Sequence, residues 1–216
     1  MEILSFIANN WSVILGLAAE HIWIVAVAVG LAILTGVPIG IAITQSKRVA
    51  DAVLYVASII VTIPSIALFG LMIPLLSTIG QGIGWLPAVI AILLYSQLPI
   101  VRNTYTAITN VDPALREAAK GMGMTPLQRL LQVEIPIAVP VIMAGVRTAV
   151  VMNIGVAAIA AYIGAGGLGV LISRGISQTD PRQLVTGAIA VSLLAMAADW
   201  ALLKLQKRLT PAGLKR

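Results

Sequence analysis

The chain has 216 residues, of which 59% are hydrophobic and only 10% are charged, and its formal net charge is +6. Soluble domains carry roughly 25% charged residues, so this shortage predicts a multi-pass membrane protein. The absence of cysteine excludes disulfides and thiolate metal sites, and the single histidine, His21, cannot form a metal cluster alone. The basic residues stand in short clusters beside apolar segments, which argues against nucleic-acid binding.

The first residues, MEILSFIANNWS, have neither a basic start nor a small-residue cleavage site, so we do not expect a cleaved signal peptide. The apolar stretch that follows the start is shorter than a span and is interrupted by Asn9 and Asn10. This pattern predicts an interfacial helix over residues 1–19 instead of a further span.

Five apolar segments have the length of about 20 residues that crossing a bilayer requires. We expect spans over residues 21–44, 52–76, 86–108, 137–163 and 184–205, within a membrane domain of residues 20–208 that is followed by a tail of residues 209–216. The predicted fold is an all-α, polytopic transmembrane helical bundle. Pro64 and Ser65 predict a bend in the second span, which is either a tolerated kink or a bend around an aqueous path.

Lysine and arginine are distributed unevenly over the connections between spans. Three regions on one predicted side hold most of them: Lys47 and Arg48; Arg116, Lys120 and Arg129; and Lys204, Lys207, Arg208, Lys215 and Arg216. The opposite side has Arg174 and Arg182. The positive-inside rule therefore predicts an outside N-terminus and a cytoplasmic C-terminus.

Residues 112–136 form a polar, charged island between long apolar segments. Asp112 and Thr125 are each followed by proline, which is the pattern of a capped helix start, and Gln128 completes a capping-box spacing after Thr125. Gly121 or Gly123 would end the first helix. Pro136 marks the start of the fourth span.

The first of these two helices has an apolar face, made by Leu115, Ala118, Ala119 and Met122 at spacings of three and four residues. An ordinary solvated loop is one interpretation of the island. The apolar face favours the other, in which the loop docks onto a partner.

The island resembles the EAA loop of binding-protein-dependent ABC importer permeases, whose pattern is E-A-A, three residues, G, nine residues, I, any residue, L-P. Here Glu117-Ala118-Ala119, Gly123 and Val133-Glu134-Ile135-Pro136 stand at that spacing, with valine for isoleucine and isoleucine for leucine. In that family the loop is the coupling helix that sits in a groove of the ATPase subunit. The resemblance assigns Glu117, Ala118, Ala119, Gly123 and Pro136 to an ATPase-coupling loop.

Most of the chain is similar to osmoprotectant permeases, importers of glycine betaine, carnitine or choline. The phrases that carry this likeness are TIPSIALFGLMIPLL from Thr62, LPIVRNTYTAITNVDPALREAAKGMGMT from Leu98, and VIMAGVRTAVVMNIGVAAIAAYIGAGGLG from Val141. Methionine importers share part of the last phrase. The resemblance implies a type I ABC importer fold like that of methionine permeases, placed in a bacterial inner membrane. It also implies as partners ABC ATPase subunits, a second copy or paralogue of the permease, and a soluble or lipid-anchored substrate-binding protein.

The chain lacks a G-x-x-x-x-G-K-[ST] loop, so we expect ATP and Mg²⁺ on the partner ATPase, with no cofactor and no enzymatic activity here. Asp199 is the one carboxylate inside a predicted span, and we expect it to pair with Lys204 or Arg208. The G-x-G-x-x-G sequence that starts at Gly164 follows an apolar helix, not a strand, so we interpret it as a tight break before a short outer helix.

Polar residues within spans are the candidates for a solute path: Asn153, Ser65, Ser96, Gln97, Tyr162 and Arg147. Two of them have open alternatives. Asn153 could instead make an interhelical hydrogen bond, and Arg147 could snorkel to the cytoplasmic interface instead of acting as a gate. No aromatic cage is evident, so we expect low affinity for solute. The rival functions are import of another solute such as methionine, or a non-transporting scaffold or channel.

Overall fold

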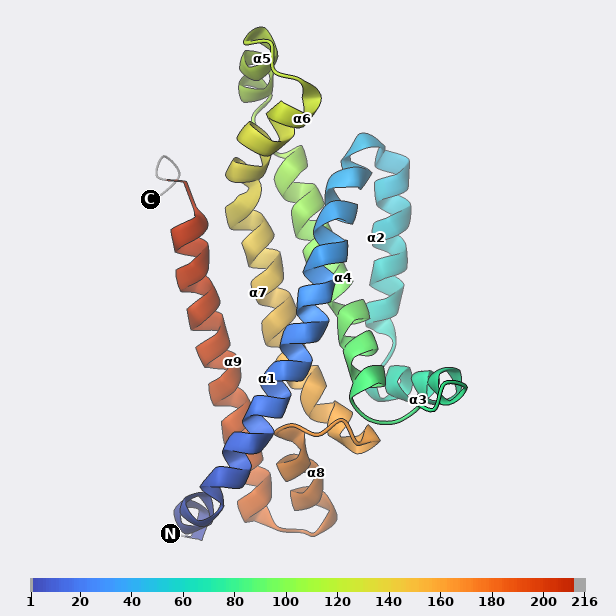
Figure 1. Ribbon diagram of the computed structural model, residues 1–216, viewed down its shortest axis with the longest axis vertical. Coiled ribbons are helices and arrows are strands. Elements are labelled where there is room, and N and C mark those ends of the chain that lie inside the picture. Colours follow the sequence, from blue (N-terminus) through green and yellow to red (C-terminus); the bar gives the residue numbers. More distant parts are fainter. Residues whose placement is uncertain (1, 212–216) are drawn as a thin grey trace.

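The computed structural model describes residues 2–211, and every regular element in that range is helical (Figure 1). The long helices are α1 (Glu2–Ala42), α2 (Lys47–Thr62), α3 (Ser65–Ser77), α4 (Trp85–Thr109), α7 (Ile135–Ile159) and α9 (Pro181–Leu209). The short elements are η1 (Ile43–Gln45), α5 (Pro113–Gly121), α6 (Pro126–Arg129), the π-helical η2 (Leu130–Glu134), η3 (Ala160–Ile163) and α8 (Gly169–Ser177). Part of the predicted tail, with Lys215 and Arg216, lies outside the described residues.

Within residues 2–211, four helical segments are long and apolar enough to cross a membrane, and the bent pair of α2 and α3 raises the number to five. The predicted all-α membrane bundle is confirmed, and the expected five spans agree with the upper number. Helix α4 begins and ends within two residues of the predicted third span. The continuous segment of α7 and η3 begins and ends within two residues of the predicted fourth span.

The N-terminal segment differs from the expectation of a separate interfacial helix. Helix α1 runs through its 41 residues without a break, over a length of roughly 60 Å, about twice the thickness of the hydrocarbon core. The asparagines lower the local hydropathy but do not end the helix, because Asn10 Nδ2 donates to Phe6 O within it at 2.9 Å. Hydropathy alone therefore misplaced this boundary.

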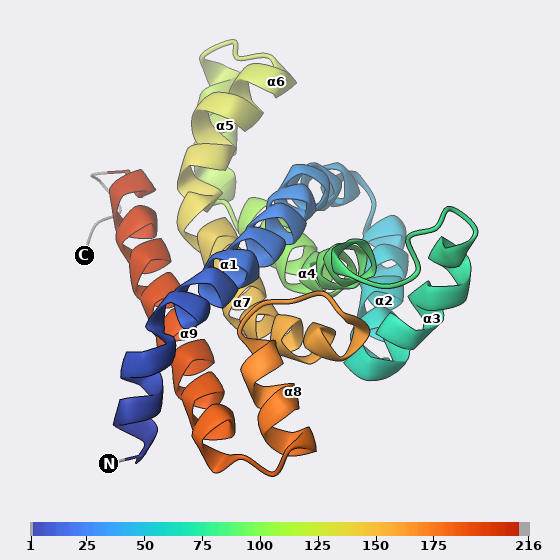
Figure 2. The ribbon, with the colours of Figure 1, turned by 60° about the horizontal axis from the view of Figure 1, so that its bottom comes forward.

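The predicted bend in the second span is confirmed, since α2 and α3 meet at 98°. Pro64 has no N–H to continue the helix, and Ile63 before it is extended, with φ −69° and ψ 126°. The Tyr95 hydroxyl of α4 donates to Ile63 O at 2.5 Å, which satisfies a carbonyl at the break. Helix α3 consequently turns to the side of the bundle (Figures 1 and 2).

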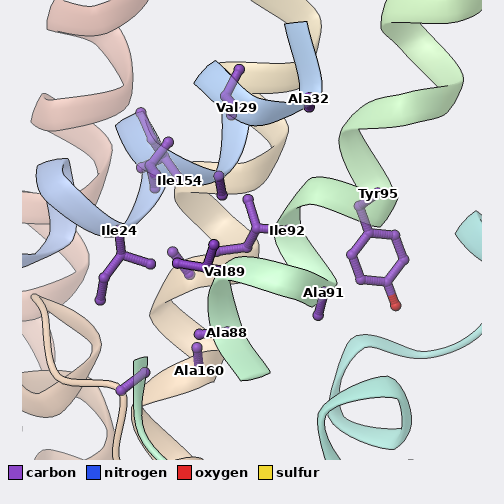
Figure 3. Close-up of a cluster of buried hydrophobic side chains, with 14 of the residues drawn as sticks. Ile24, Val29, Ala32, Ala88, Val89, Ala91, Ile92, Tyr95, Ile154 and Ala160 are labelled. Carbon is purple, nitrogen blue, oxygen red and sulfur yellow. The ribbon is translucent and has the colours of Figure 1, made fainter. Parts of the chain in front are cut away.

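The core lies where α1, α4 and α7 pack together (Figure 3). Most of its side chains are small or branched, among them Ile24, Val29, Ala32, Ala88, Ala91, Ile92, Ile154 and Ala160. Glycines bring the helices into close contact: a Cβ at Gly40 would lie 2.6 Å from Thr104 Cβ, and one at Gly145 would lie 2.6 Å from Pro99 O. Such contacts are how helices associate where lipid offers no hydrophobic drive.

The predicted basic regions gather at one end of the bundle. The turn between α1 and α2, the α5–α6 segment and the C-terminal end of α9 lie toward the top of Figure 1, whereas the N-terminus, α3 and α8 lie toward the bottom. Arg174 belongs to α8 and Arg182 to the start of α9. The chain therefore groups its cations as the sequence predicts.

Candidate functional site

The first helix of the polar island forms as expected. Asp112 Oδ1 accepts a hydrogen bond from Ala114 N at 2.8 Å, and Pro113 takes the first helical position. At the other end Gly123 adopts φ +80°, and its N–H donates to Lys120 O at 2.9 Å. Of the two glycines considered, Gly121 remains helical and Gly123 provides the left-handed turn after the helix.

The second helix begins with the predicted capping box. Thr125 N donates to Gln128 Oε1 at 2.9 Å, and Gln128 N donates to Thr125 Oγ1 at 3.3 Å. Helical turns then continue through η2 into α7, from Pro126 to Ile163. Pro136 lies in the first turn of α7. The island is thus joined to the next span by helix, without a flexible linker.

The outer surface of α5 carries most of the residues that resemble the EAA loop. Glu117, Ala118 and Gly123 are exposed, while Ala119 is buried against the chain. The predicted apolar face is therefore divided: Leu115 and Met122 remain exposed, as does Leu127 of α6. Figure 2 shows this segment projecting from the long helices. Exposed apolar side chains on a projecting helix are suited to docking.

Glu117 is an exposed, negatively charged residue on the outer surface of α5. Its side chain is 70% exposed, and Lys120 Nζ lies 2.8 Å from its Oε1. The hydrogen bond from Lys120, with its positive charge, lowers the pKa of Glu117. An exposed pair of this kind adds little to stability, so Glu117 is available to a partner.

Glu134 is a residue of this region that sequence reasoning missed. It is 6% exposed, and its Oε1 accepts from Arg129 Nε at 2.9 Å and lies 3.4 Å from Arg116 Nε. Arg116 also donates to Ile108 O at the end of α4. The motif permits any residue at the position of Glu134, so the pattern draws no attention to it. The single carboxylate nevertheless ties α5, α6 and the base of two spans together.

Three of the path candidates form polar bridges between helices, one buried and one exposed. Asn153 is fully buried, and its Nδ2 donates to Ser96 Oγ at 2.9 Å, joining α7 to α4. Gln97 Nε2 donates to Thr35 Oγ1 at 3.0 Å, joining α4 to α1. For Asn153 this geometry is the interhelical bond that stood as the alternative interpretation.

Asp199 has a different partner from those predicted. Its Oδ1 accepts from Arg147 Nη2 at 2.8 Å and from Arg147 Nε at 3.1 Å, whereas Lys204 lies over the Trp200 ring at 3.5 Å. Gln206 Oε1 accepts from Arg147 Nη1 at 3.2 Å. The expected partners share a helix with Asp199, but packing of α7 on α9 brings a residue 52 positions away closer. Arg147 is therefore held by α9.

Two hollows adjoin along the exposed face of α7. One, of about 460 Å³, is lined by Ala144, Arg147, Thr148, Val151, Met152 and Asp199. The other, of about 260 Å³, is lined by Val61, Thr62, Ile63, Pro64, Ser65, Tyr95, Met152 and Val156. Met152 lines both, so the two hollows lie side by side between the α2–α3 break and the α7–α9 contact, and we call this pair of hollows the furrow. Ser65 and Arg147 line this furrow, and Tyr162 is exposed in η3 beyond α7.

The glycine-rich segment binds a carboxylate of its own chain. Gly167 N donates to Glu20 Oε2 at 3.0 Å, and a Cβ at Gly166 would lie 2.6 Å from the same oxygen. The segment follows η3 and leads into α8 (Gly169–Ser177), as its interpretation as a break before a short helix requires. A dinucleotide-binding fingerprint requires a strand before the glycine turn and a helix after it. Residues 2–211 contain no such strand.

Residues 29–211 match the family described as "Binding-protein-dependent transport system inner membrane component". The chain belongs to this family. The permease is 57% identical to "Osmoprotectant import permease protein OsmW" of Salmonella typhimurium over 215 residues, covering all of both chains. It is 42% identical to "Choline transport system permease protein OpuBB" of Bacillus subtilis, covering 100% of this chain and 97% of that one.

Solved structures show the same fold. The permease matches a chain of the MetNI methionine ABC transporter in an inward facing conformation with a TM-score of 0.81 and 24% identity, covering 92% of this chain and 96% of that one. It matches an amino acid ABC transporter with a TM-score of 0.77 and 19% identity, covering 96% and 99%. The permease therefore has the type I ABC importer fold and is a multi-pass inner membrane subunit of such an importer.

Proposed function

We propose that the permease forms the path by which an ATP-driven importer takes up osmoprotectants such as glycine betaine, carnitine or choline. The observation that carries this proposal is the full-length identity of 57% to a permease named for osmoprotectant import. Relatives named for choline and for glycine betaine, carnitine and choline support it at 42% and 41% identity. Methionine is a weaker candidate, because the methionine transporter shares the fold at only 24% identity.

The ATPase-coupling element in this proposal is α5 with the turn after it. Glu117 and Ala118 are exposed on the helix and Gly123 shapes its end, while Leu115, Met122 and Leu127 offer apolar anchors around them. The partner would be an ABC ATPase that binds ATP and Mg²⁺, since the chain has no phosphate-binding loop of the Walker type. The end of the bundle that bears α5 would then be cytoplasmic, with the N-terminus outside.

The transport cycle would use two copies of the loop, from a homodimer or from a paralogous pair, to match two ATPase sites. Closure of the ATPases would push the loops together and open the cavity outward, and reopening would turn it inward. A substrate-binding protein would deliver solute at the opposite end, near α8. Pro126–Ile163 is helical throughout, so a displacement of the loop would reach α7 directly.

The test is reconstitution of the permease with its ATPase and binding protein in proteoliposomes. We expect uptake of radiolabelled glycine betaine that requires ATP and the binding protein, and that excess methionine does not inhibit. Flux without ATP would indicate a channel, and uptake that persists without the permease would indicate a scaffold. Either outcome would refute the proposal.

A further inference from the structure

The Arg147–Asp199 pair lies within two spanning helices, toward the end of the bundle that bears α5 and α6. Arg147 lies roughly 18 Å along α7 from Ile135, and Asp199 lies roughly 15 Å along α9 from Leu209, at 1.5 Å per residue. Removing two charges from water is unfavourable even when they pair. Helices α1, α4 and α7 associate through glycine contacts that involve no charged side chain. A charged pair at this depth therefore indicates a function beyond joining α7 to α9.

The pair also faces open space. The Arg147 and Asp199 side chains are 24% and 43% exposed, and both line the 460 Å³ hollow of the furrow. The hollow that lies between α1, α7 and α9 differs in character, because His21 is the single polar side chain among its lining residues. Of these two hollows, the 460 Å³ hollow is the one lined by charged side chains, which a charged solute requires.

The two charges match a small zwitterion. Arg147 presents a planar guanidinium, which recognises carboxylates through paired N–H donors. Both bonds from Arg147 end on Asp199 Oδ1, so Oδ2 can still face a positive group. When a zwitterion enters between the two side chains, its carboxylate takes the place of Asp199 at Arg147. Its positive group takes the place of Arg147 at Asp199. The exchange is nearly balanced electrostatically, which gives the weak binding that a passage needs.

Resting on the proposed function, we propose that Arg147 and Asp199 form a low-affinity subsite for the passing zwitterion. Arg147 receives the carboxylate of the solute and Asp199 receives its quaternary ammonium. A pair that only tethers α9 would affect every solute equally when it is broken. A subsite distinguishes solutes by charge, because glycine betaine uses both residues whereas choline has no carboxylate for Arg147.

The experiment measures solute binding to the complex of permease and ATPase in nanodiscs, without binding protein, by saturation-transfer difference NMR. We expect millimolar affinity for glycine betaine that weakens at least tenfold in Arg147→Gln, with a smaller change for choline. Arg147→Lys retains the charge and should lie between wild type and Arg147→Gln. Gln206→Leu is the matched control, since it removes the Gln206 bonds to Arg147 and Pro140 without altering a charge, and should change both solutes equally.

If Arg147→Gln cannot be purified because Asp199 is left unpaired, Arg147→Gln/Asp199→Asn is measured instead. The zwitterion then loses two charged contacts, so its binding should still fall more than that of choline. Equal effects on both solutes, or unchanged glycine betaine binding, would overturn the subsite. Neither result touches the proposed function, which is tested separately by whether wild-type uptake requires ATP, the permease and the binding protein.

Discussion

Arg129 and Glu134 are joined by a 2.9 Å hydrogen bond at the base of the projecting loop, and the same buried carboxylate lies 3.4 Å from Arg116. Arg116 belongs to α5, and Glu134 lies immediately before α7. The contact therefore links the proposed coupling helix to the span that lines the furrow. A rigid link of this kind would transmit a push from the loop to the span.

Replacing Glu134 with glutamine should loosen this link. The change leaves two arginines without their carboxylate and costs roughly 1–3 kcal/mol, less than for a fully buried pair because both arginines are partly exposed. We expect the reconstituted complex to hydrolyse ATP while importing fewer solute molecules per ATP. Glu134→Asp, which retains the charge, should recover part of the ratio. An unchanged ratio in Glu134→Gln would show that the link does not carry coupling.

Glu117→Arg should abolish association with the ATPase and leave the permease folded. The Glu117 side chain is 70% exposed, and its ion-pair partner is Lys120, three residues further along α5, so the fold loses only a surface ion pair. The measurement is copurification of the ATPase with the tagged permease. Lys120→Ala breaks the same ion pair but keeps Glu117, and should copurify normally. Recovery of a stable complex from Glu117→Arg would contradict the proposed role.

Ser96 and Asn153 should behave as a coupled pair in a double-mutant cycle. Their hydrogen bond joins α4 and α7 in the interior, and bonds of this kind in membrane helices contribute about 0.6 kcal/mol on average and at most about 1.7 kcal/mol. We expect the stability losses of Ser96→Ala and Asn153→Ala to be non-additive by that amount in denaturant unfolding of the detergent-solubilised permease. Strictly additive losses would mean that the two side chains do not interact.

Gly166→Ala should destabilise the glycine-rich segment before α8 more than Gly164→Ala. Both glycines have positive φ, 84° and 77°, so each alanine incurs backbone strain of roughly 1–2 kcal/mol. A Cβ at Gly166 would also lie 2.6 Å from Glu20 Oε2, whereas a Cβ at Gly164 would have no neighbouring atom within 4 Å. Thermal unfolding of the two variants measures the difference. Equal shifts in melting temperature would show that the carboxylate moves aside freely.

Several features of the polar island (residues 112–136) and of the second span could be predicted from the sequence because they depend on neighbours along the chain. Asp112 and Thr125 cap helices through N–H groups two and three residues away, and Pro64 breaks the second span because its ring removes a donor. The end of the N-terminal helix was predicted wrongly from hydropathy. Its continuity depends on backbone hydrogen bonds, which Asn10 does not interrupt.

The amino-acid sequence by itself determined the membrane-spanning segments, the caps and breaks of the loop, and the family pattern, since each arises from local periodicity and spacing. Only the tertiary structure decided the partners of the polar side chains. Arg147 meets Asp199, Asn153 meets Ser96, and Glu134 meets Arg116 because helix packing brings together residues that are far apart in the chain. A polar group that lies between packed helices takes whichever partner the packing presents, and no local pattern encodes that choice.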